Sequence, residues 1–407
     1  MPQHVLAVDA WNEQVDAYVA ELNARVGLTG AAPLFTGSPM AFPMVRTHIT
    51  PDLFSLWART TGDTNPLWSD AGYAAASPWG GVIAPPVVEA CLAESASQPA
   101  PAAIPGWLLL QGGSLRRYDE PFRPGDVIRG EDVWHGVEEK TRPGRPYRLF
   151  IQRAERRYIN QADRVVASLI SRIAVTAVPP AEDGEVPGGP DLAGRGPRRY
   201  SAEEQAQIRL GYEQELSGRA RRGAEPRFWE EVEVGEKLPE QLKGPYDISD
   251  AVAAAGAMGI CPAFAPKWEE IAPVADVTSV DPDTGAPHHG VDWHFDASLS
   301  RTRGFPAPPA FGTQLEGMLT HAVTNWMSDH GFLTECDFQL HSPLLQGEVS
   351  RTTGTVVGKR RDGERHLVDV EVRGETLDRH PYAKARITVD LPARDGYSPA
   401  RPASADL

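Results

Sequence analysis

The chain has 407 residues, of which 41% are hydrophobic and 23% charged, a composition that suits two or three ordinary domains with sizeable cores. Its formal net charge of −15 argues against nucleic-acid binding, because no broad basic surface would neutralise phosphates. No stretch approaches the ~18 apolar residues of a membrane span and no leader-like segment opens the chain, so we expect a cytoplasmic protein that does not enter a membrane.

The first 178 residues begin with predicted helices and end with predicted strands. Residues 1 to about 30 carry apolar residues at helical spacing. A second helix is predicted between Thr50, which can cap it, and Gly62, a residue type that ends helices with a positive φ. A longer helix is expected from about Pro86, because the apolar residues after it suit a helix buried against a sheet. Strands are predicted at residues 106–115, 126–137, 147–160 and 164–178.

The segment between the second and third predicted helices carries the strongest candidate for chemistry. Asp63 follows the helix end and opens an irregular loop, where a carboxylate can be partly desolvated yet point into a cleft. General acid–base catalysis needs that combination. The sequence Asp63-Thr64-Asn65-Pro66 also suits a plain turn, because Asp and Asn bond to their own backbone and Pro fixes φ.

The second part of the chain repeats the order of helix and then strands. Residues 179–199 are rich in Pro, Gly and Asp and predict a mobile linker. Ser201, with Glu204 three residues on, predicts a capped helix that bridges the halves. A helix capped by Ser249 follows, and then a long helix at about 311–329. Strands are predicted near residues 335–342, 347–357, 367–373 and 383–391.

Residues 62–84 resemble the hydratase motif of MaoC-type enoyl-CoA hydratases and dehydratases, in the branch with an N-terminal FAS1-like dehydratase half. The matching residues are Gly62-Asp63-x-Asn65-Pro66-Leu67, Asp70, Tyr73-Ala74 and Gly80-Gly81-x-Ile83-Ala84. The resemblance covers about residues 35–392. It implies an α+β double hot-dog fold, in which two antiparallel sheets each wrap round a long central helix as a pseudo-dimer in one chain.

This organisation divides the chain into five expected parts. They are an N-terminal helical extension (1–34), an N-terminal FAS1-like hot-dog domain (35–178), a linker with the bridging helix (179–227), a C-terminal MaoC-like hot-dog domain (228–394) and a disordered tail (395–407).

In the family, an Asp and a His five residues later act together on water, and backbone N–H groups at the start of the long helix serve the thioester oxygen. Here Trp68 stands at the His position, whereas His294-x-Asp296 in the second half parallels Trp68-x-Asp70. Neither half carries the complete pair. One hypothesis is that Asp63 and His294 form a composite catalytic site; the other is that the sites have decayed. His294 lies in an aromatic cluster and also fits a core histidine.

The resemblance implies a hydratase or dehydratase acting on acyl-CoA or on an acyl carrier thioester. The alternative is a catalytically degenerate acyl-CoA-binding subunit or scaffold that acts with a partner hydratase, and a homodimer or a heteromer with another hot-dog protein is possible. We expect backbone N–H groups near Gly81 or Gly312 to line the thioester pocket. The substrate-binding candidates are Asn65, Trp68, Gly80, Gly81 and Gly312. We expect no cofactor and no metal, because the three cysteines and the His288-His289 pair lack metal-ligand spacing.

Overall fold

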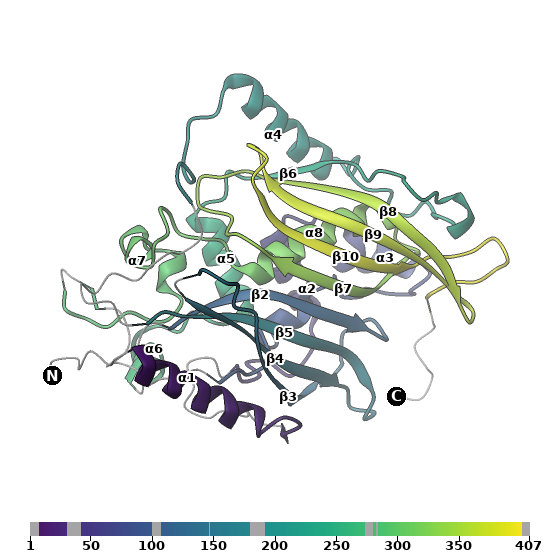
Figure 1. The fold of residues 1–407 in the computed structure, drawn as a ribbon. Helices are drawn as coiled ribbons and strands as arrows, with labels where there is room; N and C mark the ends of the chain where they lie inside the picture. Colours follow the sequence, from purple (N-terminus) through teal and green to yellow (C-terminus); the bar gives the residue numbers. More distant parts are fainter. Residues whose placement is uncertain are drawn as a thin grey trace.

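The computed structural model describes residues 8–30, 42–99, 107–145, 147–179, 192–272, 280–281 and 284–400. Within these residues, ten strands form one antiparallel sheet in the order β1-β3-β4-β5-β2-β7-β10-β9-β8-β6 (Figure 1). The first half supplies β1 (Thr29–Gly30), β2 (Trp107–Tyr118), β3 (Arg129–Glu139), β4 (Arg148–Ile159) and β5 (Val165–Ala177). The second supplies β6 (Gln241–Lys243), β7 (Phe332–Leu340), β8 (Ser350–Asp362), β9 (Arg365–Thr376) and β10 (Pro381–Asp390).

The helices lie mainly on the face of the sheet where the core is. They are α1 (Val8–Asn23), α2 (Pro51–Thr61), α3 (Ala71–Ala75), α4 (Ala202–Leu216), α5 (Ile248–Met258), α6 (Phe264–Ile271), α7 (Ala297–Thr302) and α8 (Gly312–Met327). Every residue of α8 is buried, because this helix runs between α2 and the strands of the second half. None of the helices in the described ranges combines the length and apolarity that crossing a bilayer requires.

The long helix predicted from about Pro86 is wrong. Val87 adopts a φ of 69°, which no right-handed helix allows, and only a 3-10 turn (η2, Val88–Cys91) follows. The reason is the buried Glu89, whose carboxylate accepts hydrogen bonds from Arg116 (2.6 Å) and Tyr118 (2.8 Å) of β2. The first half therefore has no counterpart of α8 in its described residues.

The N-terminal helix α1 covers part of the sheet face that this helix would have filled. Trp11 and Val15 of α1 pack against Phe150 of β4 and Ile173 of β5. Because side chains alternate along a strand, these residues share a face with Tyr158 and Leu169, which belong to the main core. The predicted N-terminal helix is thus confirmed over residues 8–23, and it completes the first core.

The linker and the tail are described only in part. Residues 180–191 of the predicted mobile linker and residues 401–407 of the predicted tail lie outside the described residues. The bridging helix is α4, and its capping box between Ser201 and Glu204 is present. The predicted disordered tail begins too early, because Tyr397 is ordered against the body and its hydroxyl donates to Asp390 at 2.6 Å.

The two halves join where β2 pairs with β7, in a register that runs from Gly113 opposite Gln339 to Arg117 opposite Glu335. Gly113 has a φ of 142°, and a Cβ there would lie 2.2 Å from the Phe338 carbonyl oxygen. This close approach is possible only without a side chain.

We expect Gly113→Ala to destabilise the protein by about 3 kcal/mol or more, because the clash is with backbone that is fixed in the sheet. Gly112→Ala is the matched control; its Cβ would meet the Arg172 carbonyl at 3.2 Å, and we expect a loss of about 1 kcal/mol or less. Urea unfolding curves of both variants test this expectation. Equal midpoints for the two variants would contradict it.

Candidate active site

Asp63 begins the loop after α2, where Gly62 ends the helix with a φ of 69° as predicted. The carboxylate is buried, and both of its oxygens are occupied. Oδ1 accepts the Asn65 backbone N–H at 2.9 Å, and Oδ2 accepts the indole N–H of Trp68 at 2.9 Å. An indole N–H does not exchange protons in catalysis, so Trp68 holds the carboxylate in place without replacing the chemistry of an imidazole.

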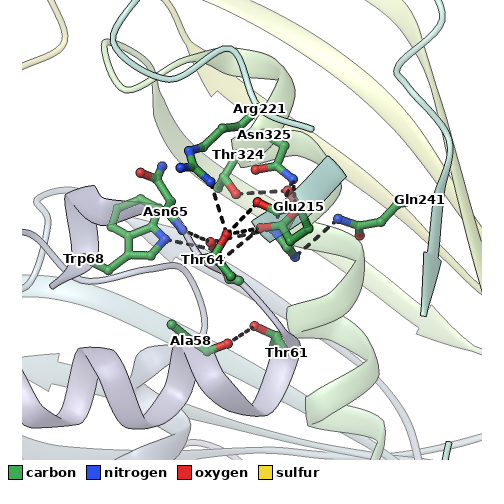
Figure 2. A network of polar contacts seen from close by, with 12 residues as sticks. Ala58, Thr61, Thr64, Asn65, Trp68, Glu215, Arg221, Gln241, Thr324 and Asn325 are labelled. Atoms are coloured by element: carbon green, nitrogen blue, oxygen red, sulfur yellow. Dashed lines mark hydrogen bonds and ion pairs between the residues drawn. The ribbon is translucent and has the colours of Figure 1, made fainter. Parts of the chain in front are cut away.

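The second half and α4 supply three further ionisable groups around Asp63. His321 of α8 places Nε2 3.6 Å from Asp63 Oδ1 and 3.3 Å from Glu215 Oε1. Lys243 Nζ lies 2.5 Å from His321 Nδ1, and it also donates to the Thr61 carbonyl. Figure 2 shows Trp68, Thr64 and Glu215 gathered at this point, where the two halves meet α4.

The environment lowers the pKa of two of these groups, which favours the ionised form of Glu215 and disfavours that of Lys243. Burial lowers the pKa of Lys243 to about 8, against the opposing effect of the carboxylates of Glu215 and Asp63. Burial alone would raise the pKa of Glu215, but hydrogen bonds from His321 and Thr64 hold it well below its usual range. At neutral pH the Glu215 carboxylate therefore faces a Lys243 side chain that is still mostly protonated, in a buried site.

Asp63, Glu215 and His321 also offer three ligand atoms within 4.8 Å of one another, a spacing that admits a divalent cation. The Lys243 ammonium already supplies positive charge there. His321 Nδ1 lies beside this ammonium and 3.3 Å from Gln241 Nε2, and His321 Nε2 lies 3.1 Å from Asn325 Nδ2. Charged and polar groups of both halves and of α4 therefore meet in this cluster.

Asn65, Tyr73 and Trp79 each donate a hydrogen bond to Asp329, which follows the end of α8. Asn65 Nδ2 donates to Asp329 Oδ1 at 2.7 Å, and the Tyr73 hydroxyl donates to Asp329 Oδ2 at 2.5 Å. The Trp79 indole donates to the Asp329 carbonyl at 2.7 Å. The predicted substrate-binding amide of Asn65 therefore faces a carboxylate of the other half.

The three predicted glycines have different surroundings. Gly80 is exposed and Gly81 is half-buried, with open space where a side chain would be. Gly312 is buried at the start of α8, where a Cβ would lie 2.2 Å from Gln111 Oε1. Gln111 thus covers this helix start, and a thioester oxygen reaches it only if Gln111 moves.

A small cavity lies on the other side of Trp68, close to the Gly80-Gly81 segment. Its lining comes from both halves and is mostly apolar: Trp68, Ile83, Ala84, Pro85, Pro86, Tyr118, Pro121, Phe122, Met327, Gly331, Phe332 and Leu333. It suits hydrocarbon and offers few polar partners.

His294 lies in the 3-10 turn η5 (Asp292–His294), with its ring stacked on Phe311 at 4.0 Å and tilted against Trp293 at 4.6 Å. Its Nδ1 lies 2.8 Å from the Pro309 carbonyl oxygen. A carbonyl only accepts, so Nδ1 carries the proton and Nε2 keeps the lone pair. Burial, with a smaller contribution from the nearby Arg303, lowers the pKa of His294 to about 4 against the opposing effect of the Pro309 hydrogen bond. The ring is therefore a neutral base at physiological pH.

The structure joins Asp63 and His294 to different partners. Asp63 contacts His321, whereas His294 contacts Phe311, which precedes α8. Ten residues of helix separate positions 311 and 321, a rise of about 15 Å. The pairing of Asp63 with His294 stays a prediction.

Sequence reasoning missed Glu215, Lys243 and His321. A signal for His321 was available, because His321 and Asn325 are polar residues four apart on a helix that is otherwise suited to the core. No sequence signal brings Lys243 of β6 to that helix.

Known proteins resemble this chain in part of its sequence and in its architecture. Residues 36–169 match the family model described as the FAS1-like dehydratase domain region. None of the curated proteins matches the chain. Among solved structures, a MaoC-like dehydratase has 16% sequence identity and a TM-score of 0.56 over 91% of this chain and 99% of its own.

Two further solved structures have the same architecture. A putative MaoC domain protein dehydratase from Chloroflexus aurantiacus J-10-fl has 14% identity and a TM-score of 0.56, over 91% of this chain and 96% of its own. A conserved hypothetical protein from Mycobacterium tuberculosis with a double hotdog fold has 13% identity and a TM-score of 0.51, over 90% of this chain and 96% of its own. These identities establish the fold alone. The predicted α+β double hot-dog fold is thus confirmed, and residues 36–169 are similar to the FAS1-like dehydratase domain region.

Proposed function

We propose that the protein is an acyl-thioester hydratase or dehydratase, with His294 as its proton-transfer group. The single observation that carries the proposal is the state of His294. Its tautomer is fixed by Pro309, its pKa of about 4 keeps it neutral, and Nε2 makes no hydrogen bond to any described residue. A general base needs an oriented ring whose unprotonated nitrogen is free to accept a proton.

In hydration, His294 Nε2 would take a proton from water while the water oxygen bonds to the β-carbon of the enoyl thioester. The protonated His294 then gives that proton to the α-carbon, and the charge that develops on the thioester oxygen needs an N–H donor. Backbone N–H groups near Gly81 remain candidates for that donor, since this segment is open. Asp63 remains the second catalytic candidate, although Asn65 and Trp68 occupy its oxygens.

A second candidate function is an acyl-thioester-binding subunit that has lost the chemistry. The bond from Trp68 to Asp63 favours it, because it converts the family's catalytic carboxylate into a buried structural group. Such a subunit would act with an active hot-dog partner, in the cytoplasm, on the same CoA or carrier thioesters.

The experiment that separates the two is a spectrophotometric hydration screen of the purified chain against enoyl-CoA esters of short, medium and long acyl groups. Loss of the conjugated-thioester absorbance supports the enzyme. Binding of saturated acyl-CoA in calorimetry without hydration supports the subunit. Neither hydration nor binding would defeat both.

If His294 is the base, we expect kcat/KM for hydration to fall at acid pH with an inflection near 4, not near the ordinary histidine value of about 6.5. The sign follows from the lowered pKa: the ring is neutral and active above about 4 and becomes protonated below it. The same shift means that His294 contributes stability above pH 6.5 that is lost as the pH falls through 4. Circular dichroism at each pH must therefore show that the protein is folded. An inflection near 6.5 would contradict the assignment.

A further inference from the structure

Arg303 ends α7 beside the proposed active site, and no carboxylate opposes it. Its guanidinium lies over the Trp293 ring, with Cζ 5.1 Å from the ring centroid. This ring is the contact that the structure gives its side chain, and no hydrogen bond or ion pair joins it to a described residue. Burial lowers the pKa of Arg303, and no nearby acid offsets that effect.

The most deeply buried arginines of the described residues have acidic partners. Arg116 bonds Glu89 at 2.6 Å, Arg156 bonds Asp132 at 2.6 Å, and Arg195 pairs with Glu348 at 2.6 Å. Arg46 and Arg221, which are half-buried like Arg303, have no acidic partner but donate to carbonyl or hydroxyl oxygens, whereas the Arg303 guanidinium donates to no described residue. A bound anion would supply the missing charge.

The position of Arg303 limits which kind of anion it can bind. Arg303 and His294 pack on the same indole, because the His294 ring centroid lies 4.6 Å from that of Trp293. The Arg303 guanidinium and the His294 ring are therefore both in contact with the Trp293 ring. If His294 acts at the β-carbon, an anion on Arg303 sits close to the reacting carbons. The phosphates of CoA lie beyond the whole pantetheine arm and are too distant.

We propose that Arg303 binds a carboxylate at the far end of a short acyl group, so that the substrate is the monothioester of an unsaturated dicarboxylic acid. The inference rests on the proposed site at His294. A planar guanidinium matches a carboxylate through two parallel N–H···O bonds, and its partial burial strengthens them.

A surface groove of about 370 Å³ adjoins this site and offers a matched control. It is lined by Leu192, Ala193, Arg301, Gly304, Phe305 and Pro306. Arg301 is exposed and, like Arg303, bonds no carboxylate among the described residues. It lies two residues from Arg303 but does not pack on Trp293, so a non-specific charge effect would appear in both arginine variants.

The test measures binding by calorimetry, which does not require turnover. The probes are succinyl-CoA, butyryl-CoA and free CoA; the first two share a four-carbon acyl group and differ in its terminal carboxylate. We expect the wild type to bind succinyl-CoA about 10- to 100-fold more tightly than butyryl-CoA. Arg303→Gln should remove that preference and leave butyryl-CoA within about 3-fold, and Arg303→Lys should retain part of it. Arg301→Gln should keep the wild-type preference.

Each other outcome overturns the inference. A wild type that binds both esters equally shows that no carboxylate is recognised. An Arg303→Gln variant that weakens succinyl-CoA, butyryl-CoA and free CoA alike places the anion on the CoA phosphates. Thermal melts of every variant confirm that it is folded. A preserved preference for succinyl-CoA without any hydration would defeat the proposed enzyme but leave the recognition by Arg303 intact.

Discussion

Replacing His294 with alanine is expected to lower kcat for hydration by about 10³-fold, because no other group in the described site holds a free, neutral proton acceptor. His294→Gln should lose as much activity, since glutamine fits beside the Pro309 carbonyl but takes no proton. His135→Ala is the matched control; His135 is exposed on β3 beside Glu155, and its loss should leave kcat unchanged. Steady-state kinetics on the best enoyl-CoA from the screen makes the measurement.

Asp63→Asn decides whether the composite hypothesis holds. If Asp63 and His294 act as a unit, Asp63→Asn alone should remove nearly all hydration, and the double variant should be no worse than either single variant. If Asp63 only ties the halves together, Asp63→Asn should lose stability and keep kcat. A His294→Ala enzyme with a wild-type rate would refute the role of His294 in both versions.

The second large effect is on stability, at the cluster that joins the halves. Glu215→Ala is expected to lower the free energy of unfolding by about 3 to 5 kcal/mol. The Glu215 carboxylate accepts from the Thr64 N–H at 3.1 Å, the Thr64 hydroxyl at 2.8 Å and Asn325 Nδ2 at 3.1 Å. Its removal would leave the buried Asn325 amide without this acceptor and Lys243 with one carboxylate fewer.

The control for Glu215 lies on the same helix. Glu213 is exposed on α4, and Glu213→Ala should change the free energy of unfolding by about 0.5 kcal/mol or less. The pH dependence gives a second check. Because the folded-state pKa of Glu215 is lowered, its contribution is present above the unfolded value of about 4.5 and is lost as the pH falls below it. The gap between wild type and Glu215→Gln in urea unfolding should therefore narrow below about pH 4.5. A constant gap, or equal effects of Glu213→Ala and Glu215→Ala, would show that the ionised carboxylate is not what matters.

Local patterns in the sequence were enough to predict the strands and most helices. The strands alternate buried and exposed residues, and α8 is long enough to be recognised without tertiary information. Gly62 and Gly259 end their helices as their type suggests, and both adopt positive φ. The caps were less predictable: Asp247, two residues before the expected Ser249, caps α5.

Long-range contacts explain what the sequence did not predict. An apolar run after Pro86 favours a helix locally, but the bond from Glu89 to Arg116 of β2 holds that segment in another conformation. The ionic cluster is assembled from α4, β6 and α8 around the loop at Asp63, and no residue of it is close in sequence to another. Charge pairing across such distances has no local pattern.

The pairing of β2 with β7 has a consequence for how the chain is made. A ribosome completes β2 long before β7; the Ser114–Glu316 hydrogen bond beside this join spans 202 positions. Until the second half emerges, the nascent first half displays a strand edge with unpaired backbone groups, which invites association with other chains. Pairings this distant in sequence also form slowly. Productive folding of this protein during synthesis thus depends on keeping the free edge of β2 unpaired until β7 of the same chain has been synthesised.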